Sequence, residues 1–431
     1  MRRAIISLLL ACTIAVAQTD FDRVLQLART RQKMTQSLTH LPDFTCVATA
    51  QRSVQKAGRA DFKVVDTLRY EIAHAGGTEL WSWPGASKFE DKPVIAMISS
   101  GSISQGEFSL HARSVFTGGY ANTKFAGVED LLSRKTLRWD YNVPMFASGW
   151  TITANGRSAP AASRGSFWAD ADTLEVVRLE IRSDGLPLDF PISSAVNTID
   201  YAQVRIGSSN ILLPQTARLY LEHSSGERRR NFTEFSHCRQ YAGTSAISFE
   251  TAHSFETAPA SPREELAEPA KTTEISLPAR ISVPIKLKTE IDSGQALAGD
   301  LVEGIIDADL KDRQILLVPK GSLITGRLRR MEKYSDPSPY FLVSIEFDDI
   351  EFPTHHARFF GTFKSLESDV PGFGWFVAWA KSTNKTLDHD TLYTTTRETE
   401  HLPDVPGVGI FFMQGSSFRL PRGMRMVWQT Q

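Results

Sequence analysis

The chain has 431 residues, more than one ordinary domain holds, and this length predicts two domains. Its 48 basic and 49 acidic residues nearly cancel, which argues against a nucleic-acid partner. Beyond the N-terminus, the longest apolar run covers residues 373–380 and is far shorter than the roughly 20 residues of a membrane-spanning helix.

The first residues have the pattern of a bacterial secretory signal. Two arginines precede an apolar run over residues 4–11, and Ala15-Val16-Ala17 stands before Gln18. The pattern predicts a signal peptide over residues 1–17 and a periplasmic or outer-membrane-associated protein. An alternative is lipoprotein processing, which would leave a lipid anchor on Cys12, but the apolar run is shorter than that signal favours.

Two cysteines remain after removal of the signal, Cys46 and Cys238. Each lies in a short strand-like segment, at either end of the first predicted domain. Export makes a disulfide between them stable, and it would join the first and last strands of that domain. The loop-entropy model gives such a closure roughly 5 kcal/mol. The alternative is two buried free thiols.

The first domain is predicted over residues 18–250, with a helix from Asp20 to Pro42 and a second helical stretch from Gly106 to Phe116. Between and after them, apolar residues alternate with polar ones, which predicts half-buried strands of an antiparallel meander. Asn155-Gly156 is a two-residue hairpin signal. The alternating positions are Phe62, Val64, Leu68, Tyr70 and Ile72; Leu137, Trp139, Tyr141 and Val143; Val177, Leu179 and Ile181; and Ala217, Leu219 and Leu221.

The N-terminal helix, the meander and the Trp-x-Asp turn at Trp168–Asp170 together resemble the lipoprotein-carrier fold typified by LolA and LolB, over residues 20–245. The resemblance implies a curved, incomplete barrel around a cavity for acyl chains, with helices as a lid. No position of this sequence matches a ligand-binding residue of that family. A carrier would need a hollow lined by Leu68, Tyr70, Leu137, Trp139, Leu179 and Leu219.

Residues 251–275 change character and are rich in proline, alanine and glutamate. Few of them could be buried, so they predict an extended linker between two domains that fold separately.

The second domain, residues 276–431, begins with alternating apolar positions from Ile281 to Ile291, and Pro284 argues for an edge strand or a bulge there. Pro319-Lys320-Gly321 and Pro421-Arg422-Gly423 predict turns with a positive glycine φ. Further strands are predicted at residues 301–306, 315–318, 322–329 and 341–347.

The second domain also has a family resemblance, to the TrbI-like β-barrel of conjugation and type IV secretion channel proteins. It lies in 277–287, in Gly299-Asp300, in 318–327 and in 420–423. The resemblance implies a small barrel that assembles below the outer membrane, with an inserted segment reaching into it. The cleavable signal departs from those proteins and makes a secretion-channel role doubtful.

An aromatic cluster interrupts the strand pattern between residues 364 and 403. One hypothesis is a tip that contacts a membrane or a partner, because aromatics suit membrane interfaces. The favoured interpretation is a short core helix or a plug for the barrel. The cluster consists of Phe373, Trp375, Phe376, Val377 and Trp379.

Metal and catalytic motifs are weak, and we expect neither a metal, a cofactor nor an enzyme. His355 and His356 are adjacent and would point to opposite faces of a strand. Asp388-His389-Asp390 with His401 is a chance-level cation candidate, and no nucleophile elbow, zinc-protease helix or phosphate loop occurs. Turn and solvated-strand chemistry accounts for the remaining charged residues, Glu129, Asp130, Asp170, Asp172 and Arg228-Arg229-Arg230.

The sequence therefore predicts a mainly β protein: an N-terminal curved antiparallel half-barrel with covering helices, a linker and a small C-terminal β-barrel. The favoured function is a non-catalytic cell-envelope protein that binds or organises envelope components, with envelope proteins or a second copy as partners of the C-terminal barrel. The alternative is a periplasmic carrier of a lipid or other apolar ligand in the half-barrel.

Overall fold

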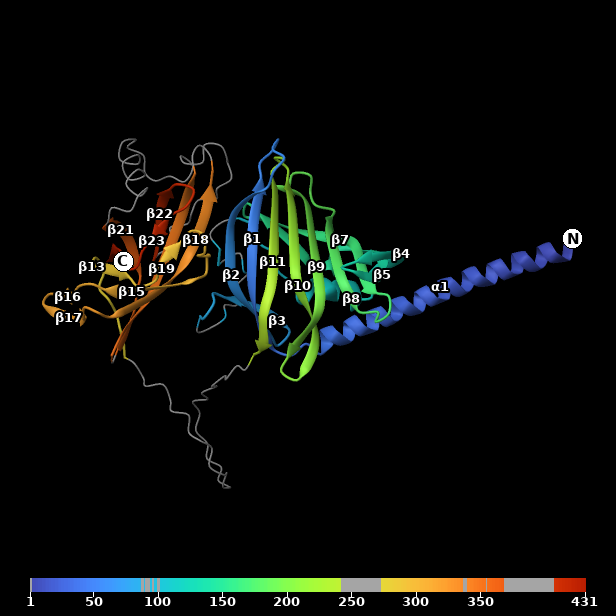
Figure 1. Cartoon of the computed structure of the whole chain (residues 1–431), viewed down its shortest axis with the longest axis horizontal. Coiled ribbons are helices and arrows are strands. Elements are labelled where there is room, and N and C mark those ends of the chain that lie inside the picture. Colours follow the sequence, from blue (N-terminus) through green and yellow to red (C-terminus); the bar gives the residue numbers. More distant parts are fainter. Residues whose placement is uncertain are drawn as a thin grey trace, which may run out of the picture.

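The computed structural model describes residues 2–86, 89, 94, 97–98, 101–241, 273–335, 339–353, 355–367 and 407–431. In these ranges the chain is mainly β, and most strands belong to two large sheets, one from each half of the chain. Figure 1 shows the two sheets side by side, with β18 (Leu323–Tyr334) of the second next to β2 (Lys63–Ala75) of the first.

The first sheet has eleven strands in the order β3-β2-β1-β11-β10-β9-β8-β7-β5-β4, with β6 paired to β7. All its pairings are antiparallel, and the sheet curves into a half-barrel. Its other strands are β1 Phe44–Gln55, β3 Thr78–Ser82, β4 Asn122–Leu131, β5 Arg134–Val143, β6 Trp150–Ala154, β7 Arg157–Asp170, β8 Val176–Asp184, β9 Ile192–Ile206, β10 Ser209–His223 and β11 Arg228–Gln240.

The strand order confirms a meander with one long crossing. After β3 the chain passes from one edge of the sheet to the other before β4 begins, and it then returns strand by strand until β11 lies beside β1. The crossing segment carries α2 (Leu110–Phe116). This topology places a helix over the sheet and makes the first and last strands neighbours.

The helices differ from prediction at their starts. α1 (Arg2–Thr39) ends before Pro42 as expected, but it begins before Asp20, because no glycine or proline interrupts residues 2–39. α2 begins after the expected Gly106, which has a φ of +92° that a right-handed helix does not accept. A short third helix, α3 (Met145–Ser148), follows β5.

The concave face of the first sheet holds its core. Trp139, Phe167 and Leu179 lie opposite one another on neighbouring strands, and each is almost fully buried. The rings of Trp139 and Phe167 stack with centroids 5.3 Å apart. Period-two alternation therefore predicted the buried face correctly for β5, β8 and β10 and for Leu68 to Ile72 of β2. Val64 of β2 is exposed, contrary to prediction, because the pairing of β1 with β2 shifts register between Arg52 and Ser53.

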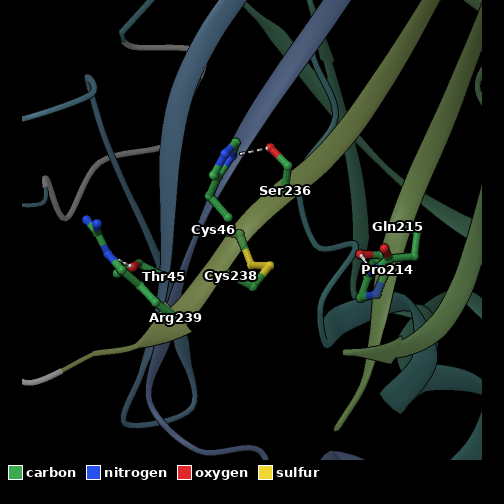
Figure 2. The surroundings of a disulfide bond; sticks show 8 residues. Thr45, Cys46, Pro214, Gln215, Ser236, Cys238 and Arg239 are labelled. Atoms are coloured by element: carbon green, nitrogen blue, oxygen red, sulfur yellow. Dashed lines mark hydrogen bonds between the residues drawn. A yellow bond between two sulfur atoms is a disulfide. The ribbon is translucent and has the colours of Figure 1, made fainter. Parts of the chain in front are cut away.

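The predicted disulfide is present and links β1 to β11 (Figure 2). Cys46 and Cys238 have Cα atoms 4.1 Å apart and lie 192 positions apart in sequence. The strand register shifts between Thr45 and Val47, and His237 has a positive φ of 52°, so an irregularity in pairing lies beside the bond. Figure 2 also shows Arg239 donating to the Thr45 hydroxyl, at 3.3 Å.

The second sheet has the order β12-β20-β19-β18-β15-β13-β24-β21, with β22 paired to β19. β21 also lies against β22, so the sheet curls toward a small barrel around its own apolar core. Its other strands are β12 Thr273–Ile275, β13 Ser282–Leu287, β15 Leu301–Ile306, β19 Tyr340–Phe352, β20 His355–Arg358, β21 Gly361–Glu367, β22 Val408–Gln414 and β24 Arg425–Thr430. Two short separate sheets pair β14 Ile291–Asp292 with β23 Arg419–Leu420, and β16 Leu310–Asp312 with β17 Ile315–Val318.

Most turn predictions are confirmed. Gly321 and Gly423 have φ values of 93° and 83°, at the expected positions of the two Pro-x-Gly turns. Asn155 and Gly156 both have positive φ and connect β6 directly to β7.

The edge strand or bulge predicted from Pro284 is wrong, since neither is present. β13 is paired on both sides, with β15 and with β24. The proline is tolerated because β15 ends opposite Ile285, and the Pro284 carbonyl accepts from the amide of Asp307 just beyond that end. The proline therefore lies in an interior strand, opposite Val427 of β24 on one side and just beyond the end of β15 on the other.

The two sheets contact each other through backbone and side chains. Ala298 forms a parallel bridge with Leu68 on the stretch of β2 that β3 leaves unpaired: the amide of Arg69 donates to Ala298 at 2.7 Å. Arg69 also pairs with Asp300 at 2.8 Å, and Arg329 lies over the Trp83 ring. The free edge of the half-barrel is thus continued by the second half of the chain.

No helix of the described residues is long and apolar enough to cross a membrane. Residues 242–272, which include most of the predicted linker, lie outside the described part, and β12 begins at Thr273. The aromatic cluster at Phe373, Trp375, Phe376 and Trp379 also lies outside it, as do Asp388-His389-Asp390 and His401. The domain boundaries stay predictions.

Candidate functional site

The predicted lining residues all lie in the interior of the first sheet, each no more than 6% exposed. Five of them belong to one continuous apolar cluster, while Leu219 lies opposite Asn197 and Asn231 on the neighbouring strands. A ligand among these side chains stays a prediction. The residues are Leu68, Tyr70, Leu137, Trp139, Leu179 and Leu219.

The segment that crosses between β3 and β4 covers this interior. Phe116 of α2 meets the ring of Phe167 at 4.9 Å, and Phe108, just before α2, meets Phe235 at 5.0 Å. Met34 and Leu38 of α1 belong to the same cluster. The sheet and its helices therefore enclose one apolar volume, and the chain's own aromatic rings occupy part of it.

Two carboxylates, the partly buried Glu79 and the buried Glu107, lie beside this apolar volume, although neither was predicted from the sequence. Glu79, on β3, accepts backbone hydrogen bonds from Gly106 at 3.0 Å and Ser109 at 3.3 Å, which holds the chain entering α2. Glu107 is 3% exposed and accepts from the amide nitrogen of Asn197 at 3.0 Å. Neither forms an ion pair with any residue that the structure describes.

Burial dominates the electrostatics of these groups. Burial, helped by the nearby charge of Glu107, raises the pKa of Glu79 to about 7, although backbone donors oppose the shift. Burial likewise lowers the pKa of His111, which lies near Glu107 and meets Trp150 edge-on at 5.4 Å. Burial is therefore the main cause of both shifts, and it disfavours the charged form of each group.

Two polar atoms beside the carboxylates have no hydrogen-bond partner among the described residues. They are the hydroxyl of Tyr201 and the side-chain oxygen of Asn197. Asn197 and Tyr201 are both on the concave face of β9, and both are more than nine-tenths buried. Burial, followed by the charges of Glu107 and Glu79, raises the pKa of Tyr201 and keeps its hydroxyl protonated. We call Glu79, Glu107, Asn197 and Tyr201 the interior polar cluster.

This cluster offers hydrogen-bond acceptors and one hydroxyl inside an apolar shell, an arrangement suited to binding a group that donates hydrogen bonds. Within the described residues, no group of three His, Cys, Asp or Glu side chains is arranged to hold a metal ion.

The other acidic candidates form hydrogen bonds that hold the local fold. Asp170 accepts from the amides of Asp172 and Thr173, which lowers its pKa and fixes the turn. Glu129 accepts from the Trp168 indole at 2.9 Å.

The histidine and arginine candidates lie on strands. His355 and His356 lie next to each other on β20, and His355 stacks on Phe352. In the arginine run, Arg228 pairs with Glu222 and Arg229 with Glu227, while Arg230 lies over the Phe62 ring.

Sequence patterns do not predict the interior polar cluster. Glu79 has the appearance of an ordinary polar strand position, and Glu107 precedes a short helix without a motif. Only the crossing between β3 and β4 brings the two together.

Comparisons with known proteins give distant structural likenesses. No family model matches the chain, and no curated protein matches it. A solved domain from Vibrio parahaemolyticus, described as an outer membrane lipoprotein-sorting protein, aligns with a TM-score of 0.27 and 12% identity, covering 51% of this chain and 93% of its own.

Two further solved structures align over a similar share. A DUF1329 family protein from Desulfovibrio piger has a TM-score of 0.25 and 14% identity over 50% of this chain and 92% of its own. A LolA superfamily protein from Nitrosomonas europaea has a TM-score of 0.26 and 11% identity over 49% and 93%. Likeness this distant assigns neither ligand nor activity to this chain, and the TrbI-like resemblance stays a prediction.

Proposed function

We propose that the half-barrel is a non-catalytic binding module of the cell envelope that carries an apolar ligand of the lipid acyl-chain class. The observation that carries the proposal is the continuous apolar interior on the concave face of the first sheet, enclosed by α1, α2 and the crossing segment. Enclosed apolar volumes with a few convergent polar groups are the usual form of small-molecule sites.

The cover of this interior supports the proposal. α2 has only seven residues. The chain that enters it is held by Glu79, whose carboxylate accepts hydrogen bonds from the backbone amides of Gly106 and Ser109. A helix this short has little stability of its own and depends on packing. Its displacement would make room for a chain beside Trp139 and Phe167 without breaking any strand pairing.

A second candidate function is organisation of envelope components by the two halves acting as one unit. The specific observation is a buried ionic cluster between the sheets. Arg52 and Asp66 pair on β1 and β2, Arg330 and Glu332 pair on β18, and the charge of Glu332 acts on both Arg52 and Asp66. The two functions are compatible, with envelope proteins or a second copy as partners of the second half.

The first measurement is native mass spectrometry of protein purified gently from envelopes, with organic extraction of anything bound. A monomer with a stoichiometric apolar species supports carriage. An empty protein in defined oligomers supports organisation instead. Replacement of Cys12 by serine, followed by cell fractionation, tests the anchor: unchanged membrane association would rule out lipidation at that residue.

The location of the ligand is tested with 12-bromododecan-1-ol, because bromine quenches tryptophan fluorescence only at close contact. Trp139→Phe should remove much of the quenching, since Trp139 lies in the proposed site. Trp428→Phe is the matched control, because Trp428 is equally buried in the core of the second sheet. Quenching that is lost in the Trp428 variant, or absent in the wild type, contradicts the proposal.

A further inference from the structure

We infer that the interior polar cluster binds the ammonium head of an apolar-tailed amine, with the tail lying along the apolar face of the half-barrel. The inference rests on the proposed function, since it names the ligand class for that same interior. It follows from the positions of Glu79, Glu107, Asn197 and Tyr201 and from the two polar atoms among them that have no hydrogen-bond partner in the described part of the chain.

The first argument concerns the two carboxylates of the cluster, which have no ion-pair partner among the described residues. Glu107 is buried, Glu79 is partly buried on β3, and no described Lys, Arg or His forms an ion pair with either. His111 lies near Glu107, but burial lowers its pKa and so disfavours its cationic form. Buried carboxylates are ordinarily paired with a cation, because an isolated buried charge is costly. Backbone amides and Asn197 satisfy part of the hydrogen-bonding capacity and supply no formal positive charge. A cationic ligand would supply the positive charge that the described residues do not place beside these carboxylates.

The second argument is independent of the carboxylates. The side-chain oxygen of Asn197 has no described partner, although the nitrogen of the same amide donates to Glu107. The orientation of this amide is fixed, since only its nitrogen can face a carboxylate. The oxygen is therefore an acceptor left open beside Glu107, and the unpartnered hydroxyl of Tyr201 lies on the same strand face. Unsatisfied buried polar atoms are uncommon in folded proteins and call for a partner.

The chemistry of the head group follows from these atoms. An ammonium has three donors and no acceptor, and it can bind two carboxylates and an amide oxygen at once. An ionised carboxylate head brings no hydrogen-bond donor to the open oxygen of Asn197, and an alcohol head brings one, whereas an ammonium head brings three. Metal ions are disfavoured because the described residues supply no group of three suitable ligands.

The tail follows from the surroundings. Leu179 and Ile199 are fully buried beside the cluster, and Ile199 lies between Asn197 and Tyr201 on the same face of β9. A hydrophilic amine would bury no apolar surface there. An amine with a long alkyl chain satisfies the polar cluster and the apolar wall together.

The test uses the full chain and competes probes against 12-bromododecan-1-ol while Trp139 fluorescence is followed. The competitors are dodecylamine, dodecan-1-ol, dodecanoate and butylamine. Dodecylamine should displace the probe at least about 10-fold more tightly than dodecan-1-ol, because a charge-assisted hydrogen bond exceeds a neutral one. Glu107→Gln should reduce that preference to about 3-fold or less, while Glu234→Gln, an exposed position on β11, should leave it unchanged.

The outcomes separate the two proposals. If the probe quenches Trp139 but dodecylamine competes no better than dodecan-1-ol, the amine inference is wrong and apolar carriage stands. If butylamine competes as well as dodecylamine, the tail has no role and the inference is wrong. If no probe quenches Trp139, the proposed function fails first. The wild-type panel decides these points even if the Glu107 variant does not fold.

Discussion

Replacement of Glu79 by glutamine should make the half-barrel more stable above neutral pH. The folded-state pKa of Glu79 is about 7, against an ordinary value of 4.5. The folded protein therefore holds the Glu79 proton more tightly than the unfolded chain does. The stability that this group contributes is fully present below about pH 4.5 and is lost as the pH rises through 7. A shift of this size corresponds to about 3 kcal/mol, because each pKa unit is worth about 1.4 kcal/mol.

The assay is urea unfolding between pH 4 and pH 8, followed for the wild type and Glu79→Gln. Glutamine keeps one oxygen for the amides of Gly106 and Ser109 but does not ionise. The difference in unfolding free energy between variant and wild type should shift in favour of the variant by about 3 kcal/mol over this range. Glu234→Gln, at an exposed position, should follow the wild type. Parallel pH profiles for wild type and Glu79→Gln would refute the assignment of a raised pKa to this carboxyl.

Three further predictions concern the disulfide and the contact between the sheets. Reduction of Cys46–Cys238 should lower the free energy of unfolding by up to roughly 5 kcal/mol for a separation of 192 residues, measured by urea unfolding with and without dithiothreitol; a double Cys→Ser variant that still responds to the reductant would contradict this. Gly299→Ala should speed amide exchange at Arg69 and Ala298, because φ is +104° and a Cβ would overlap the Arg69 carbonyl; Gly321→Ala, with a φ of +93° and open space around it, is the control that should leave those amides protected. Asp66→Asn should destabilise the protein by about 3 kcal/mol or more, because it leaves the Arg52 guanidinium buried without its carboxylate; a urea midpoint equal to the wild type's would show that Glu332 alone is a sufficient partner.

Local rules predicted a large part of the fold. Period-two alternation identified the buried face of β5 and β8, and β15 and β17 have the predicted bounds. Asn155-Gly156 and the two Pro-x-Gly sequences specified their turns because each fixes backbone dihedrals within four residues. The disulfide was predictable because removal of the predicted signal would leave one possible pair.

The remaining features depend on contacts between distant segments. Pro284 was assigned to an edge strand or a bulge, because the sequence of one strand does not reveal that the neighbouring β15 ends one residue short of it. Glu79 and Glu107 come close together only through the crossing that carries α2 over the sheet. The pairing of Ala298 with Leu68 joins segments more than 200 residues apart, and no local pattern encodes it.

The interior and the contact between the sheets share one face of the half-barrel. Arg52 lies two residues after Ala50 on β1, and Asp66 lies two residues before Leu68 on β2. Residues two apart on a strand lie on the same face, so the charged pair continues the apolar rows. The ionic cluster therefore lies at one end of the apolar rows that contain the proposed site, and Glu332 of β18 acts on it from the second sheet. Burial raises the pKa of Asp66, and the guanidinium of Arg52 opposes that shift. A ligand that entered between the sheets would have to break this cluster, whereas one that displaced α2 would leave it intact. The cost of separating buried charges favours entry at α2, and the second sheet then acts as the fixed wall of the site.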